Sequence, residues 1–389
     1  MTSPSFKTYR PITTREALIE HLSWAQSLEL STVPPYLTAM YSLQDATSDA
    51  YQLVKGVVIE EMLHLTLVCN LMVAVGGEPT FDKATVPEYP TYIPHHAAGG
   101  PFISLQALSV DVARNTFCAI EAPANQKVPP AEGDDYQTIG QFYQAILEGF
   151  EYLDGKLGAA LYVDHGEKQL HQEQYFGGGG GRVFVVRDLA SARRAIEEIV
   201  QQGEGHSPWG RTGGSEPYGG RFHYGIRPDG TYGPILGPGS EQSHYQRFVE
   251  LVDGTAPIGA TWPMQTNIRA DQIGDEATRA LAETFDRVWT LLLRYIGRSF
   301  TGPGGRALFF RGAVPLMHGV MPAMARALMQ TPLDPRTGDL GPNAGPGFQL
   351  VDGEVSAASV ADAITKLAAT AVGKPLVSLL PLLRQLPEL

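Results

Sequence analysis

The chain has 389 residues, of which 43% are hydrophobic and 18% are charged, a composition typical of a globular protein with a well-buried core. The net charge of −12 argues against binding to nucleic acid or anionic lipid, because affinity for phosphate groups comes from clustered Lys and Arg. The sequence shows no membrane-spanning apolar run and no signal peptide at its start, so we expect a cytoplasmic protein with a small-molecule partner and no membrane partner.

Two long helices are predicted in the first quarter of the chain. The first begins near residue 14, where Thr13 and Glu16 form a capping box, and the apolar residues that follow keep helical spacing. The second covers about 49–75 and ends at Gly76-Gly77, which is a helix-stop signal.

Segments rich in Pro and Gly then separate the later helices. A long insertion follows the second helix and carries one short apolar run, residues 182–186, that could be a strand. A third bundle helix starts near Ser191 and stops where Gly203 and Gly205 flank Glu204. Helices are predicted over about 105–120, 136–156, 189–204, 240–252, 275–299, 306–331, 355–371 and 375–385.

These elements predict an all-α fold, in which a four-helix bundle carries long inserted loops and extra helices. We expect the bundle to occupy residues 1–335, with insertions at 77–188 and 206–240. Residues 336–389 would form a C-terminal extension that packs on the bundle. Apolar helix faces near the C-terminus could also pair two copies of the chain in a homo-oligomer.

The second helix carries a metal-ligand motif in the sequence EEMLH. Residues three apart lie on one face of a helix, so Glu61 and His64 can point at one metal ion. The motif lies within the apolar run VVIEEMLHLTLVCNLMVAV, where an unpaired carboxylate would cost several kcal/mol unless a cation compensates it. Either Glu60 or Glu61 must therefore face inward, and the spacing to His64 selects Glu61.

A second pair, Glu241 and His244, has the same spacing in the sequence EQSH. Each pair is preceded by a helix that carries a glutamate, Glu29 in the first half and Glu204 in the second. The order Glu, ExxH, Glu, ExxH is the ligand pattern of ferritin-like bundles that bind two metal ions. The predicted ligands are therefore Glu29, Glu61, His64, Glu204, Glu241 and His244.

Four carboxylates and two imidazoles suit two iron ions, with manganese or a mixed-metal pair as the alternative. Zinc fits less well, because structural zinc prefers four tetrahedral ligands with more sulfur and nitrogen. The competing interpretation for any single Glu is a solvated helix face. In the second half, which is more polar, Glu197 and Glu198 are the alternatives to Glu204.

Further residues have two interpretations each. Glu121 could enter the same site from the insertion, or it could be a helix-end carboxylate near water. His318 is interpreted as a core histidine, with a pocket role as the alternative. The aromatic residues of the bundle could line a cavity, but at helical spacing they are more simply core; they are Trp24, Tyr36 and Tyr143.

The two helical motifs also resemble a known family. The segments HLSWAQSLELSTVPPYLTAMYSL and VVIEEMLHLTLVCNLMVAVGGEP are similar to the ferritin-like domain of the iminophenyl-pyruvate dimer synthase family (VioB/RebD-like), and weaker similarity extends over most of residues 14–350. The resemblance implies a ferritin-like bundle with inserted segments in secondary metabolism. Members of that family couple two imino acids, derived from an aromatic amino acid, by oxidation.

Three functions compete. The first is an oxidoreductase or oxygenase in which a reduced di-metal centre activates dioxygen or peroxide to oxidise a small amino-acid-derived substrate, with the long loops shaping the pocket. The second is metal binding or storage without an organic substrate. The third is an accessory protein that has lost the metal. The complete ligand set and the length spent outside the ligand-bearing helices favour the enzyme.

Overall fold

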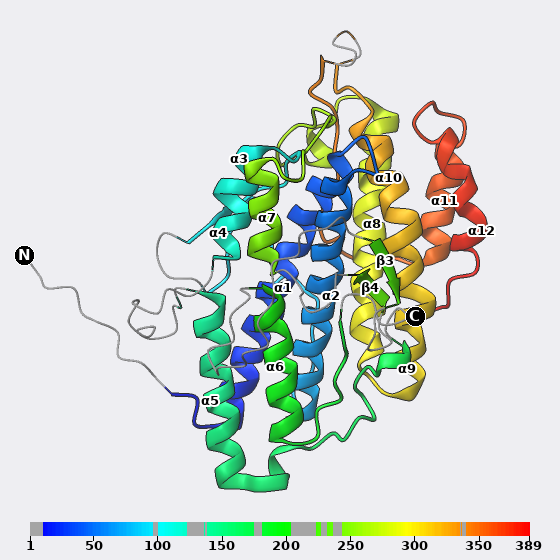
Figure 1. Cartoon of the computed structure of the whole chain (residues 1–389). Coiled ribbons are helices and arrows are strands. Elements are labelled where there is room, and N and C mark those ends of the chain that lie inside the picture. The colour runs from blue at the N-terminus through cyan, green and yellow to red at the C-terminus, as the bar shows by residue number, and fades with distance from the viewer. Residues whose placement is uncertain are drawn as a thin grey trace, which may run out of the picture.

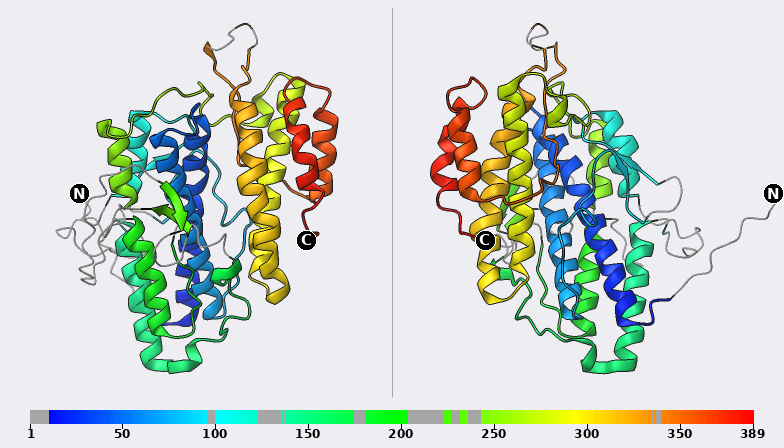
Figure 2. Two further views of the ribbon diagram at one scale, coloured as in Figure 1. Left: turned by 45° about the vertical axis from the view of Figure 1, so that its right-hand side comes forward. Right: turned by 180° about the vertical axis from the view of Figure 1, so that it is seen from behind.

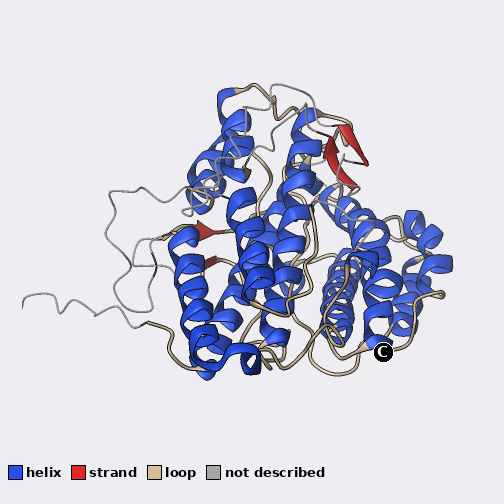
Figure 3. Ribbon diagram, turned by 60° about the horizontal axis from the view of Figure 1, so that its bottom comes forward, coloured by secondary structure: helices blue, strands red, loops and turns tan. Residues whose placement is uncertain are grey.

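The computed structural model of the chain describes residues 11–95, 100–122, 136, 138–174, 181–203, 223–226, 232–235, 243–334, 336 and 340–389. Helices dominate this part of the chain (Figure 3). Its strands form two short antiparallel pairs, in which β1 (Thr91–Tyr92) pairs with β2 (Phe102–Ile103) and β3 (His223–Ile226) with β4 (Tyr232–Ile235). The predicted all-α architecture is confirmed.

Two long helices, α1 (Arg15–Ser42) and α2 (Asp49–Ala74), form the centre of the protein. The Thr14 side chain accepts a hydrogen bond from the Ala17 amide at 3.1 Å and starts α1, so the predicted capping box at Thr13 is wrong by one residue. Ser48 starts α2 in the same way, by accepting from the Tyr51 amide. Hydroxyl caps of this kind satisfy amides that lack a partner within the helix.

Two interrupted columns of helix complete a four-helix bundle around α1 and α2 (Figure 1). In one column, an upper segment stands above α5 (Ile139–Leu157). In the other, α7 (His244–Asp253) stands above α6 (Leu189–Gly203). The upper segment of the first column consists of α3 (Val110–Val112), the π-helix η1 (Ala113–Phe117) and α4 (Cys118–Ile120). The bundle thus combines two continuous helices with two that are broken near the middle.

The C-terminal helices add two further layers on the opposite side of α1 and α2 (Figure 2). Helix α10 contacts both α1 and α8, and α11 packs on the outer side of α8. The predicted helix over 306–331 is interrupted by two π-helical stretches. The elements are α8 (Glu276–Ser299), α9 (Pro303–Leu308), the π-helices η6 (Phe309–Ala313) and η7 (Leu316–Val320), α10 (Met321–Met329), α11 (Ala357–Leu367), the 3₁₀ helix η9 (Lys374–Leu379) and α12 (Leu380–Leu383).

The expected strand at 182–186 is wrong, because side chains bind its backbone in place of a partner strand. The amide of Val183 donates to Gln172 Oε1 at 2.7 Å, and the amide of Val186 donates to Gln169 Oε1 at 2.7 Å. Short 3₁₀ helices lie at Gly158–Leu161, Gln172–Gln174 and Ala270–Gln272.

Helix α2 is the most apolar of the long helices. Its length and composition would suffice to cross a membrane, but 94% of its most apolar 18-residue window is buried inside the protein. Burial on all sides is what the core helix of a bundle requires.

Candidate metal centre

The first carboxylate of the centre is Glu29, which α1 places on the face that packs against α2 and α5. Its side chain is buried, with 2% exposure. The hydroxyl of Tyr143, from α5, donates a short hydrogen bond to Glu29 Oε1, while Glu29 Oε2 lies 3.4 Å from Nδ1 of His64. Oε2 of Glu29 therefore faces the motif on α2.

Helix α2 presents Glu61 and His64 one turn apart, as the spacing predicts. Glu61 Oε2 accepts a hydrogen bond from the Thr32 hydroxyl at 2.6 Å, and Glu61 Oε1 lies 2.8 Å from Nδ1 of His244. On the far side of its ring, Nε2 of His64 lies 2.9 Å from Oε1 of Gln202. Both α2 side chains are buried.

The remaining members come from the ends of the interrupted helices. Glu121 is the C-terminal cap of α4, and His244 is the first residue of α7. Oε1 of Glu121 accepts a hydrogen bond from the Tyr36 hydroxyl at 2.7 Å, and Oε2 lies 3.6 Å from Nδ1 of His244. The breaks in the two columns therefore bring a carboxylate and an imidazole to the level of the α2 motif.

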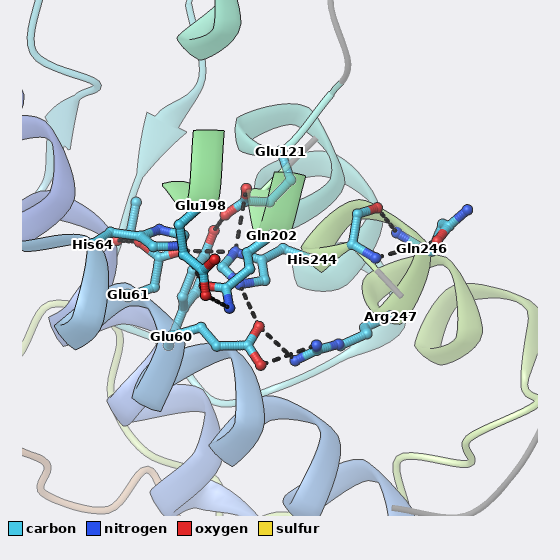
Figure 4. A network of polar contacts seen from close by, with 12 residues as sticks. Glu60, Glu61, His64, Glu121, Glu198, Gln202, His244, Gln246 and Arg247 are labelled. Atoms are coloured by element: carbon cyan, nitrogen blue, oxygen red, sulfur yellow. Dashed lines mark hydrogen bonds and ion pairs between the residues drawn. The ribbon is translucent and has the colours of Figure 1, made fainter. Parts of the chain in front are cut away.

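One ligand atom from each of Glu61, His64 and His244 lies within 4.8 Å of the other two (Figure 4). The rings of the two histidines are stacked, with centroids 5.3 Å apart. This is a separation that one or two bound cations could bridge, with Glu29 and Glu121 at either side of the group.

The electrostatics of this cluster show how strongly its members affect one another. Burial and the neighbouring Glu121 carboxylate raise the pKa of Glu61 to about 7. Burial alone would lower the pKa of His244, but the Glu121, Glu60 and Glu61 carboxylates raise that pKa well above its usual value. A carboxylate-rich, desolvated group of this kind needs positive charge, which protons or a metal can supply.

The donor set fits a metal such as iron or manganese. Carboxylates and imidazoles are the ligands of such centres. Nδ1 of His244 is buried and makes no well-formed hydrogen bond to any described group, although two carboxylates face it. An imidazole nitrogen in that position can coordinate a cation. The residues that would hold the metal are Glu29, Glu61, His64, Glu121 and His244.

Glu60 and Arg247 support His244 from behind. Oε2 of Glu60 lies 3.0 Å from Nε2 of His244, and the Arg247 guanidinium binds both Glu60 oxygens, at 2.9 and 3.1 Å. Figure 4 shows these contacts between Glu60, His244 and Arg247. All three side chains are fully buried. Because Glu60 engages Nε2, the opposite nitrogen of the ring is the one that faces Glu61.

The structure thus brings together four of the six predicted ligands, Glu29, Glu61, His64 and His244, and adds Glu121, the additional candidate. Glu204 and Glu241 lie outside the described residues. Of the alternatives to Glu204, Glu198 accepts hydrogen bonds from the Arg182 amide and from Gln202.

The helical spacing predicted for Glu241 and His244 is wrong. Ser243 has extended backbone angles and is the N-cap, so α7 begins at His244 and Glu241 precedes the helix. Helix α6 is described as far as Gly203, so the predicted place of Glu204 at the end of this helix stays a prediction.

Several residues of the site were missed or interpreted as core. Tyr36 and Tyr143 are buried, as core residues are, but their hydroxyls bind two of the carboxylates. The spacing to His64 selects Glu61 over Glu60, but both carboxylates are buried. Glu61 faces Nδ1 of His244, whereas Glu60 faces Nε2 of the same ring and the Arg247 guanidinium. Arg247 is not predicted, although the sequence indicates its position: it follows His244 by three residues, so the two lie on one face of α7.

Comparison with known proteins identifies relatives of this chain. Residues 22–253 match the sequence family described as ferritin-like. The chain is 24% identical to dichlorochromopyrrolate synthase of Lentzea aerocolonigenes, over 87% of this chain and 36% of the relative. It is 25% identical to 2-imino-3-(indol-3-yl)propanoate dimerase of Chromobacterium violaceum, over 86% of this chain and 34% of the relative. The chain thus spans about a third of the length of these two proteins, and the matches confirm the resemblance seen in the sequence.

A solved structure shares the fold. A ferritin-like protein from Caulobacter vibrioides superposes with a TM-score of 0.57 at 24% identity, covering 82% of this chain and 96% of that one. This likeness confirms the ferritin-like four-helix bundle and extends over most of the chain.

Proposed function

Because this chain belongs to the ferritin-like family, we propose that it is a metal-dependent oxidoreductase whose buried cluster between α1, α2, α4 and α7 binds two iron ions, with manganese as the alternative metal. The observation that carries the proposal is the convergence of Glu61, His64 and His244 within 4.8 Å, from two helices far apart in the sequence. Among the residues that the structure describes, Glu29 and Glu121 would be the other two ligands. We propose Glu204 and Glu241, which lie outside the described residues, as further ligands.

When bound, a pair of iron ions would supply the electrons that reduce dioxygen or peroxide. The residues of the chain have the tasks of binding and orientation. The Tyr143 hydroxyl donates to one oxygen of Glu29, and the Tyr36 hydroxyl donates to one oxygen of Glu121. The second oxygen of each carboxylate is left for the metal. Glu60 holds Nε2 of His244, and Gln202 holds Nε2 of His64, so each imidazole presents Nδ1 to the centre.

We propose an amino-acid-derived substrate, such as an imino acid that bears an aromatic ring. The support is that one relative is named for the dimerisation of an imino acid of this class. Both relatives are named as enzymes, which favours catalysis over metal storage as the role of the cluster. Oxidative coupling in secondary metabolism is the corresponding reaction.

The metal content of the protein tests the proposal. We expect about two iron or manganese ions per chain by mass spectrometry after purification without added metal or chelator, or after anaerobic iron loading. Glu61→Ala and His244→Ala should lose them. The matched controls Glu148→Ala and His165→Ala replace exposed residues of the same types and should retain them. A wild-type protein that takes up no metal after anaerobic loading contradicts the proposal.

Oxygen consumption tests the redox part separately. The iron-loaded, reduced protein should consume dioxygen in a single turnover, and addition of an aromatic imino acid should make consumption continue. If the protein takes up metal but reacts with neither dioxygen nor peroxide, the proposed metal site is supported and the proposed oxidoreductase activity is contradicted.

A further inference from the structure

A cavity of about 160 Å³ lies between α1 and α2 on one side and α8 and the η6–α10 segment on the other. Helix α2 separates it from the candidate metal centre. Val58, Ile59 and Met62 line the cavity, whereas Glu61 and His64 face His244 on the other side. The cavity is thus a second site, and an inference about it does not depend on the proposed function.

The lining of the cavity suits one aromatic ring. An engineered protein cavity of about 150 Å³ holds a benzene molecule, so the volume here matches a ligand of one ring. Thioethers make favourable contacts with aromatic rings, and methionines and aromatic side chains together make up much of the wall. The methionines are Met40, Met62, Met317 and Met321, and the aromatic residues are Tyr41, Tyr51, Trp289 and Phe309.

The nitrogen-bearing side chains of this wall are Lys55, His318 and Trp289, and Thr66, Tyr41 and Tyr51 add hydroxyl groups. Desolvation and the nearby Lys55 ammonium lower the pKa of His318 to about 4, so His318 is neutral at pH 7 and Lys55 is the cation of the wall. Burial lowers the pKa of Lys55, because its charge is partly removed from water. An anion in the cavity would lie beside this ammonium, in a place that water only partly reaches.

Trp289 adds a second polar group to the wall of the cavity. The side chain is 1% exposed, and its Nε1–H has no hydrogen-bond acceptor among the described residues. Buried donors are normally paired, and leaving one unpaired is unfavourable. Met317 and His318 also belong to the π-helix η7, and π-helical turns within longer helices occur frequently at functional sites.

We propose that this cavity binds a small aryl carboxylate. The ring lies among the methionines and aromatic side chains, Lys55 supplies the opposite charge, and the Nε1–H of Trp289 donates a hydrogen bond to the ligand. The interpretation of His318 as a plain core residue is therefore replaced by the alternative, a position in the wall of a pocket.

Binding of 3-phenylpropionate tests the proposal, with 3-phenylpropanamide as the uncharged control. The chain contains four tryptophans, so nitrogen-15 NMR resolves a small set of indole N–H signals, and Trp289→Phe identifies the signal of Trp289. We expect the acid to shift that signal with saturation and the amide to bind at least about tenfold more weakly, as loss of a charged hydrogen-bond partner implies.

Two variants locate the site. Lys55→Met removes the charge but keeps the apolar stem, and should weaken binding of the acid at least about tenfold, whereas Lys156→Met, at an exposed lysine on α5, should leave it unchanged. Leu292→Phe should fill the cavity and abolish binding. Circular dichroism and metal content that match the wild type show that each variant is folded.

Three results would overturn the proposal. The acid could leave the Trp289 signal unmoved, the amide could bind as tightly as the acid, or Lys55→Met could bind the acid with unchanged affinity. Each result is independent of whether the candidate metal centre binds metal.

Discussion

Glu60 of α2 and His244 of α7 form a fully buried contact, in which Oε2 of the carboxylate lies 3.0 Å from Nε2 of the imidazole. The same carboxylate binds the Arg247 guanidinium. Glu60 does not face the proposed metal, but it holds the His244 ring that does.

Glu60→Gln should weaken metal binding about 10- to 100-fold, which is the usual effect of removing a partner that orients a ligand. A competitive titration with a coloured chelator measures the affinity. Glu148→Gln, an exposed glutamate on α5, serves as the control and should bind like the wild type. Equal affinities for Glu60→Gln and wild type would show that Glu60 does not orient His244.

Arg247→Met should destabilise the protein by about 3–5 kcal/mol, because it leaves the Glu60 carboxylate buried without its cation. Urea unfolding of the metal-free protein gives the difference. The double variant Glu60→Met with Arg247→Met removes both charges and should recover much of the loss. If the double variant loses as much stability as the two single variants added together, this interpretation is contradicted.

Tyr143→Phe should affect the metal-free protein more than the metal-bound protein. Without metal, loss of the hydroxyl leaves Glu29 Oε1 without its buried donor, at a cost of about 1–3 kcal/mol. Bound metal would compensate part of that cost by attracting the same carboxylate. Melting temperatures with and without metal test this difference. The control Tyr152→Phe, at an exposed tyrosine, should leave both melting temperatures unchanged. If Tyr143→Phe lowers the melting temperature equally with and without metal, Glu29 is not a ligand.

Asp286 on α8 makes the stability of the protein depend on pH. Burial raises the pKa of its carboxyl to about 7, although the Gln349 amide donates a hydrogen bond to it. The folded protein therefore binds this proton more tightly than the unfolded chain, and stability should fall as the pH rises from about 4 to about 7.

Asp286→Asn removes this titration and should stabilise the protein at pH 8, by at most about 4 kcal/mol. Urea unfolding at pH 5 and pH 8 measures the effect, with the exposed Asp362→Asn as the control. The gain should be larger at pH 8 than at pH 5, and the reverse order would contradict the assignment.

Bound metal should stabilise the fold, because ligands that bind only the folded state shift the unfolding equilibrium. At a free metal concentration of about 100 times Kd the gain is about 2.7 kcal/mol. The melting temperature should therefore rise with Fe(II) or Mn(II) in the wild type and stay constant in His64→Ala. A rise of equal size in both proteins would place the stabilising metal elsewhere.

The sequence predicts the first half of the site because that half depends on local spacing. Glu61 and His64 lie one turn apart on an uninterrupted helix, and helical periodicity alone brings them to one face. Periodicity, together with cap and stop signals, also predicts the start of α1 and both ends of α2 to within one residue.

The second half could not be placed in this way because the chain leaves the helix at the site. The prediction that Glu241 shares a helix with His244 overlooked the capping box of Ser243 and Gln246, which the sequence S-H-Y-Q does contain. The contact between Tyr36 and Glu121 joins residues 85 positions apart, and no local pattern indicates it. Only tertiary packing brings the end of α4 to α1.

The interruption of two of the four bundle helices has a consequence for the evolution of such proteins. The connections from α4 to α5 and from α6 to α7 adjoin residues of the centre along the chain, because Glu121 caps α4, Gln202 lies in α6 and His244 begins α7. Insertions and deletions in these connections leave the uninterrupted pair α1 and α2 intact, and lengthening a connection has only a small entropic cost. Variation in these connections can therefore change what reaches the centre, while the continuous helices that carry Glu29, Glu61 and His64 keep their positions.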